Sequence, residues 1–154
     1  MRLTHYWQKL LLTPALLVAF LSSIALGNDE PAALKVSFTE VKPQSGLVFC
    51  NLFADENGFP GDPKKAKRSI SVAVDGSDLI CDFGQLEPGV YAVAAMHDEN
   101  GNGKLDTNFI GIPKEGWAVS NNVGPGLFGP PSFKQASFEI VGSDSVQIKL
   151  DLRY

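Results

Sequence analysis

The residues best suited to chemistry lie in the stretch HDENGNGKLDTNF, residues 97–109 of this 154-residue chain. Oxygen-bearing side chains stand there at alternate positions, and a tightly curled loop turns every second side chain toward one centre. Gly103 occupies the place where such a loop makes its sharpest turn. Because the donors are hard oxygens, the pattern favours Ca²⁺ over zinc or copper. The predicted ligands are Asp98, Asn100, Asn102 and Asp106 through their side chains and Lys104 through its carbonyl group.

Two features separate this loop from an EF-hand. Phe109 occupies the position of the bidentate glutamate, and a predicted strand rather than a helix precedes the loop. The missing oxygens would come from Glu99, Asn108 or Glu115. So few carboxylates predict a modest affinity, with a dissociation constant on the order of 10⁻⁴ M. The alternative is a turn without an ion, because Asn and Gly adopt positive φ angles readily.

His97 directly precedes the loop, and we expect its imidazole to hydrogen-bond the loop backbone or a carboxylate and so support the ligands. A multi-histidine zinc site is not expected, because the other histidine, His5, lies in the N-terminal segment. One alternative is a hydrolase that uses His97 and a carboxylate, although the nucleophile pattern G-x-S-x-G does not occur. Another is a carbohydrate- or small-molecule-binding module in which Trp117 and Tyr91 stack on a ligand.

Residues 1–27 have the pattern of a secretory signal peptide. Two basic residues accompany an apolar run of about a dozen residues, and Ala25-Leu26-Gly27 fits a cleavage site. The alternative is an uncleaved anchor, although the run is short for a bilayer and contains Pro14. Cleavage predicts an exported protein, periplasmic or secreted, in which residues 28–154 form one domain with its core at about 34–152.

The predicted mature domain is acidic. Removal of Arg2 and Lys9 leaves 11 basic against 17 acidic residues. This balance argues against a nucleic-acid partner, which requires a basic face, and is compatible with binding a cation. No second apolar run approaches the length of a membrane span. The expected partner is a protein or a glycan that the sequence does not identify.

Cys50 and Cys81 both remain in the predicted mature chain. Alternation places each among apolar neighbours on the core side of a strand. In an oxidising compartment paired cysteines commonly form disulfides. A bond between them would close a loop of about 31 residues and stabilise the domain by roughly 3–4 kcal/mol. The alternative is two buried free thiols that pack as small apolar groups.

After Pro31 the apolar residues recur with a period near two, which predicts strands. No stretch has the length and capping of a confident helix, and residues 63–68 are the one candidate for a short helical turn. About seven short strands predict an all-β fold, an antiparallel two-sheet sandwich of the immunoglobulin or transthyretin-like kind. The predicted strands are residues 34–38, 46–53, 69–74, 78–83, 89–98, 133–140 and 146–152.

The segment 98–131 is long for a loop in a compact domain, which is typical of functional loops. Its apolar residues Phe109, Ile110, Trp117, Leu127 and Phe128 predict a loop that packs on the domain rather than a solvated one. An ion at 98–106 would order residues 98–122 and shape a binding surface. That predicted surface comprises Trp117, Ser120, Asn121 and Asn122.

The tetrapeptide Asp-Glu-Asn-Gly occurs twice, at residues 55–58 and 98–101, each time just after a predicted strand. If successive strands alternate in direction, the two copies lie at opposite ends of the sandwich. We therefore expect two separate loops and not two halves of one site.

Three segments together resemble a family of exported bacterial proteins catalogued as domain of unknown function 2141. They are FGQLEPGVYAVAAMHDENGNGKLDTN (83–108), IGIPKEGWAVSNN (110–122) and PPSFKQASFEI (130–140). The resemblance covers roughly residues 34–152, and the family implies no established activity. More loosely, FGQLEPGVYAV is similar to a strand of transthyretin-like and Cna-B-type sandwiches, which are commonly adhesion, scaffold or carrier modules. We therefore expect a non-enzymatic domain.

Overall fold

The computed structural model describes residues 30–76, 78–127 and 129–154. The predicted signal peptide, residues 1–27, lies outside the described residues. No helix among those described is long and apolar enough to cross a membrane.

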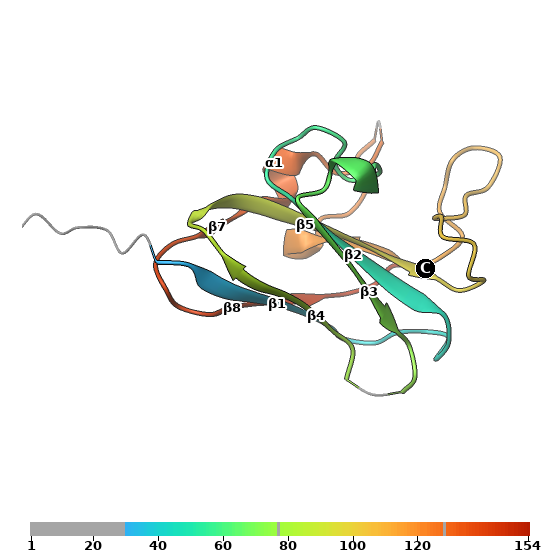
Figure 1. The fold of residues 1–154 in the computed structure, drawn as a ribbon. Coiled ribbons are helices and arrows are strands. Elements are labelled where there is room, and N and C mark those ends of the chain that lie inside the picture. The colour runs from blue at the N-terminus through green and yellow to red at the C-terminus, as the bar shows by residue number, and fades with distance from the viewer. Residues whose placement is uncertain (1–29, 77, 128) are drawn as a thin grey trace, which may run out of the picture.

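The described residues form eight strands in two sheets that pack face to face, which confirms the predicted two-sheet β-sandwich (Figure 1). The smaller sheet contains, in spatial order, β4 (Ile80–Leu86), β1 (Ala32–Phe38) and β8 (Val146–Leu150). The larger contains β3 (Arg68–Ala73), β2 (Leu47–Phe53), β5 (Gly89–Asp98) and β6 (Trp117–Val119), and β7 (Phe138–Ile140) pairs with the first residues of β5.

The pairing departs from the expected antiparallel pattern at one place. β8 runs parallel to β1, with Val36 opposite Ile148, whereas β1 and β4 are antiparallel. The alternation of apolar residues identifies a strand and its buried face, but it is the same for either strand direction. The parallel pair therefore has no signal in the sequence.

The core lies between the sheets, where alternate residues of the strands are buried. In β2, Val48, Cys50 and Leu52 have no exposed surface. Cys50 forms a disulfide with Cys81 of β4, which confirms the predicted bond. Since β2 and β4 belong to different sheets, the disulfide links the two layers through the middle of the core.

Two segments differ from their predictions, one expected to be a strand and the other a loop. The expected strand 133–140 is a one-turn helix, α1 (Phe133–Ala136), followed by β7. A capping box between Ser132 and Gln135 favours the helical turn there. The 98–131 segment contains β6 and a 3₁₀ turn, η2 (Ser120–Asn122), that were not predicted. The expected helical turn after Pro63 is present as η1 (Pro63–Lys65).

The antiparallel pairing of β2 with β5 sets the position of the candidate loop. Leu47, the first residue of β2, lies opposite Asp98, the last residue of β5, and Phe53 lies opposite Ala92. The loops that follow the two strands therefore leave from opposite ends of the pair, as expected for the repeated Asp-Glu-Asn-Gly sequences. In Figure 1 the loop after β5 stands away from the sheets.

Candidate functional site

Asp98 is the residue around which the candidate loop curls. It ends β5 and is almost completely buried, with 1% of its surface exposed. Its Oδ1 accepts hydrogen bonds from the backbone N–H groups of Gly101 (2.8 Å) and Asn102 (3.1 Å), and its Oδ2 accepts one from Gly103 (2.7 Å). One carboxylate thus organises the backbone of three consecutive residues. Gly101 and Gly103 have φ angles of 75° and 74°, a region that glycine enters without strain.

The polar side chains of the curl converge on Asp106. The amide Nδ2 of Asn100 lies 2.7 Å from Asp106 Oδ2, and that of Asn102 lies 3.0 Å from Asp106 Oδ1. The oxygens of the same amides accept backbone N–H groups, from Asn102 at 3.0 Å and from Lys104 at 2.8 Å. A half-turn of either amide exchanges its oxygen with its nitrogen. The loop therefore brings the side chains of Asn100 and Asn102 to Asp106, while Asp98 holds the backbone of the same curl.

Glu115 holds the two ends of the loop together. It is buried, with 4% of its surface exposed, and lies just before β6. Its Oε1 accepts the N–H of Glu99 at 3.0 Å and its Oε2 accepts the N–H of Asp106 at 2.8 Å. The N–H of Lys114 donates to the carbonyl of Asp106 at 2.8 Å. A residue named only as a possible additional ligand is thus a brace for the loop backbone.

The other two candidates for additional ligands are placed differently. The side chain of Asn108 accepts the N–H groups of Ile110 and Ile112, each at 3.0 Å, so it belongs to a turn further along the chain. The negative charge of Glu99 contributes to raising the pKa of Tyr154. Among the described residues, no three His, Cys, Asp or Glu side chains form a group that could hold a metal ion. Any ion in the curl would depend on two carboxylates supplemented by amide and carbonyl oxygens.

One residue needed by the site was missed by the sequence analysis. Gly46, just before β2, has a φ of 92° and lies against the end of β5. A Cβ atom there would lie 2.4 Å from the carbonyl oxygen of Asp98. The sequence offers only a glycine before a strand, because the close approach arises from the pairing of β2 with β5.

His97 is completely buried and bonds away from the curl. Its Nε2 lies 2.7 Å from the carbonyl oxygen of Ser45, which can only accept, so Nε2 carries the proton. Its Nδ1 then accepts the hydroxyl of Tyr154 at 3.1 Å, and the Tyr154 oxygen accepts the N–H of Lys42 at 2.7 Å. The imidazole therefore ties the segment before β2 to Tyr154. This differs from the expected bond to the loop or to a carboxylate.

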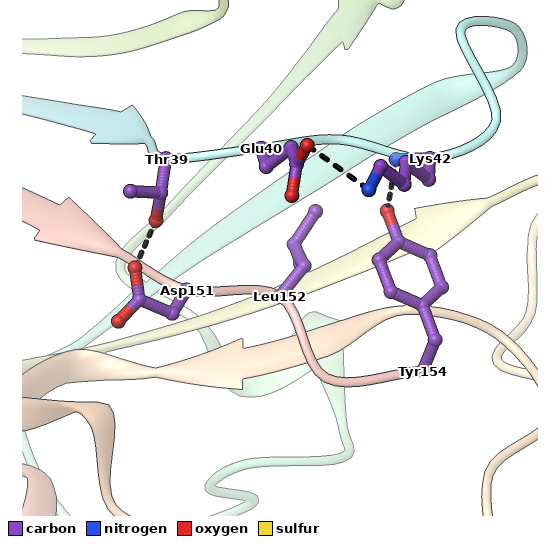
Figure 2. A pocket seen from close by; sticks show the side chains of 6 residues that line it. All are labelled: Thr39, Glu40, Lys42, Asp151, Leu152 and Tyr154. Atoms are coloured by element: carbon purple, nitrogen blue, oxygen red, sulfur yellow. Dashed lines mark hydrogen bonds and ion pairs between the residues drawn. The ribbon is translucent and has the colours of Figure 1, made fainter.

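Tyr154 also borders a shallow hollow of about 330 Å³ between residues 39–42 and residues 151–154 (Figure 2). Its polar groups pair with one another: Lys42 Nζ lies 3.0 Å from Glu40, and the hydroxyl of Thr39 bonds Asp151. Burial raises the pKa of the Tyr154 phenol, and the negative charges of Glu99 and Glu40 raise it further against the opposing effect of the Lys42 N–H. The hollow contains none of the residues predicted to bind a ligand.

The residues of the predicted binding surface make internal contacts. Ser120 has no exposed surface; its hydroxyl accepts the N–H of Val93 at 2.9 Å and donates to the carbonyl of Ala136 at 2.6 Å. Asn121 and Asn122, with φ angles of 61° and 51°, direct their amides to backbone groups of neighbouring segments. These three residues thus join β5, α1 and β8, and Ser120 is not available to a partner.

The expectation that the apolar residues of 98–131 pack on the domain is wrong for several of them. Phe109 is 99% exposed, Leu127 96% and Ile110 64%. Trp117 is half-buried, and the guanidinium carbon of Arg153 lies 5.9 Å from the centre of its ring. Phe128 lies outside the described residues. For Ile110 the reason is local, because its backbone is held in the turn formed by Asn108 and not against the sheets.

No curated protein and no solved structure matches the chain. A family model described as "Uncharacterized protein conserved in bacteria (DUF2141)" matches residues 36–149. The matched segment contains the curl, Glu115, the disulfide and most of both sheets, and it confirms the resemblance seen in the sequence. The chain belongs to this family of bacterial proteins.

Proposed function

We propose that this protein is an exported, non-enzymatic β-sandwich domain whose 98–106 curl binds Ca²⁺, and that the ion orders a surface for a partner. The observation that carries the proposal is the convergence of Asn100 and Asn102 on Asp106, in a curl whose backbone is held by the buried carboxylate of Asp98. Four oxygen-bearing side chains on one short curl are the donor set that hard cations prefer.

The ion would act by replacing hydrogen bonds with coordination. With Ca²⁺ present, a half-turn of each amide directs its oxygen inward, and the Asp106 carboxylate exchanges two amide donors for the cation. Because Asp106 is also bonded to Glu115 and Lys114, coordination there would fix the chain between β5 and β6. The segment 98–122 would thereby become more rigid.

The arrangement of His97 supports a non-enzymatic role. A general base must reach its substrate, whereas this imidazole is fully buried and both of its ring nitrogens are bonded. The hydrolase alternative therefore has no accessible base at His97. The carbohydrate-binding alternative is weakened as well, since Tyr91 is 4% exposed and cannot stack on a ligand.

Export is supported by the disulfide between Cys50 and Cys81, since structural disulfides persist in oxidising compartments and are rare in the cytosol. A mature N-terminus at Asn28, found by mass spectrometry of the protein recovered outside the cytoplasm, is the expected result. A chain that retains residues 1–27 would contradict cleavage.

The calcium proposal is tested by thermal melts of residues 28–154 after removal of divalent ions with a chelator. With a dissociation constant on the order of 10⁻⁴ M, ~1 mM calcium should add about 1.4 kcal/mol to the free energy of unfolding. Calcium should raise the melting temperature, and equal magnesium should not. No shift with calcium, or an equal shift with magnesium, would overturn the assignment.

The variant Asp106→Ala locates the ion, because Asp106 receives both amides and is only half-buried. We expect it to abolish the calcium shift while the protein remains folded. The matched control is Asp55→Ala in the other Asp-Glu-Asn-Gly sequence. The Asp55 carboxylate accepts the backbone N–H of Asn57 and receives no side-chain amide in that turn. This control should retain the full calcium shift.

A further inference from the structure

Most edges of the two sheets are occupied or distorted. An exposed edge can pair with another chain, and folded proteins commonly cover or bend it. At the edge of β8, the side chain of Asn122 donates to the carbonyl of Lys149 at 3.2 Å and accepts the N–H of Asp151 at 2.9 Å. At the edge of β6, Trp117 and Arg153 exchange backbone hydrogen bonds at 2.8 and 2.9 Å.

β4, the other edge of the smaller sheet, is bulged. Its register with β1 shifts by one residue, so Phe83 lies opposite no residue of β1. The guanidinium of Arg68 donates to the carbonyl of Phe83, and the Asp82 carboxylate accepts the N–H of Gly84 at 2.9 Å. A bulge of this kind bends a strand and disfavours further pairing along it.

β3, the edge of the larger sheet, is regular and open. Val74, directly after the strand, donates to the carbonyl of Gly46 opposite it at 3.0 Å. Backbone bonds to a neighbour alternate along an antiparallel pair, so the N–H and C=O groups of Ser69, Ser71 and Ala73 point away from β2. No other strand pairs with this edge in the described part of the chain. The three side chains are small and exposed.

The two ends of β3 carry opposite charge. Residues 62–68 contain four basic residues against one acidic residue, whereas residues 74–79 contain two acidic residues and no basic one. Residues 69–73, between them, contain no charge and no proline. In an antiparallel pair the start of one strand lies beside the end of the other. Two copies of β3 paired in this way bring unlike charges together, whereas parallel pairing brings like charges together.

We propose that β3 pairs antiparallel with β3 of a second copy of this chain and joins the two larger sheets into one. The register that uses every outward group places Ser71 on the two-fold axis, opposite Ser71 of the partner copy, and Ser69 opposite Ala73. Lys67 then lies opposite Asp75 of the partner copy. Within one chain these two residues are roughly 25 Å apart along the strand, so their attraction acts between copies.

The pairing also sets how the two curls face. Leu47 lies opposite both Ala73 and Asp98, so the curl of each copy is at the Ala73 end of β3. Because Ala73 lies beside Ser69 of the partner copy, the two curls stand at opposite ends of the joined sheet. The pairing goes beyond calcium binding and does not depend on an ion in the curl.

The test is sedimentation velocity of residues 28–154 in chelator, at protein concentrations from about 1 μM to about 1 mM. One strand pair is a small interface, so we expect a dimer that dissociates on dilution. Ser71→Pro removes an N–H that makes no bond to β2 and should weaken dimerisation about tenfold or more. The matched control is Gln147→Pro, an exposed position of β8 whose N–H also points away from its neighbour, because Leu150 of β8 bonds β1. This control should dimerise like the wild type.

A charge exchange tests the register without changing the strand backbone. Lys67→Glu and Asp75→Lys should each weaken the dimer about fivefold, and the double variant Lys67→Glu/Asp75→Lys should restore it. Circular dichroism should show every variant folded. A monomer at all concentrations, equal weakening by Ser71→Pro and Gln147→Pro, or a double variant no tighter than the single ones would overturn the proposal.

Discussion

Glu115→Gln tests whether a buried carboxylate braces the candidate loop. The carboxylate accepts the N–H groups of Glu99 and Asp106, one on each oxygen. A glutamine keeps one oxygen and replaces the other with an NH₂ group, which would face an N–H. We expect the variant to remain folded but to lose stability. If the remaining oxygen faces the N–H of Glu99, the hydrogen bond from the N–H of Asp106 is lost.

The magnitude follows from burial and charge. A hydrogen bond to a charged acceptor contributes about 1.5–3 kcal/mol, and at 4% exposure water cannot replace it. The neutral amide avoids part of the desolvation cost of a buried carboxylate, which places the expected loss toward the lower end of that range. Since folded domains are stable by about 5–15 kcal/mol, this loss is readily measured.

The assay is urea unfolding in chelator, so that no metal contributes, together with amide hydrogen exchange at Glu99 and Asp106. The control is Glu139→Gln, an exposed residue of β7 whose substitution should change stability by less than about 0.5 kcal/mol. If Glu115→Gln unfolds like the wild type and both amides stay equally protected, the bracing role is refuted.

Two further predictions concern the core and the C-terminal contact. Replacing Cys50 and Cys81 with alanine should lower the unfolding free energy by about 3–4 kcal/mol in urea titrations, because the disulfide closes a loop of 31 residues; an unchanged midpoint would contradict this. Burial raises the pKa of Tyr154 above 10.0 in the folded protein. The stabilisation that the protonated phenol gives the folded state is therefore complete below pH 10, and it is lost as the pH rises through the pKa of the folded state. The stability difference between wild type and Tyr154→Phe should therefore be constant near neutral pH and narrow above pH 10, whereas a constant difference at every pH would argue against the shift.

The strands were predictable because burial on one face imposes a period of two on the sequence. β2, β5 and β8 were located within a few residues from this pattern, and the disulfide from the two cysteines on core-facing positions. What the pattern omits is the partner of each strand. The parallel pairing of β8 with β1, and the close approach of Gly46 to Asp98, arise from contacts between segments that no local pattern records.

The sequence of the loop predicted which residues meet but not how they are used. Alternate spacing correctly brings Asn100 and Asn102 to Asp106, because the curl follows from local hydrogen bonds to Asp98. The role of Glu115 depends on a chain reversal between Asp106 and this glutamate, which spacing does not reveal. Apolar composition was misleading for Phe109, since composition cannot distinguish a side chain that packs inward from one held outward by a turn.

The two copies of Asp-Glu-Asn-Gly separate the local contribution from the tertiary one. Asp55 and Asp98 both begin turns in which the carboxylate accepts backbone N–H groups, so the short sequence alone suffices for the turn. After the first copy, the ring of Phe59 packs edge-on against the ring of Phe53, with 5.3 Å between the ring centres, and the chain returns to the domain. After the second copy, the residues Asn-Gly-Lys-Leu-Asp continue the curl. The pairing of Asp98 with Leu47 of β2 buries Asp98, whereas Asp55 is exposed. The difference between a plain turn and a candidate ion site therefore lies in the residues that follow and in the sheet beneath, which is why a motif at this length predicts a turn more reliably than a function.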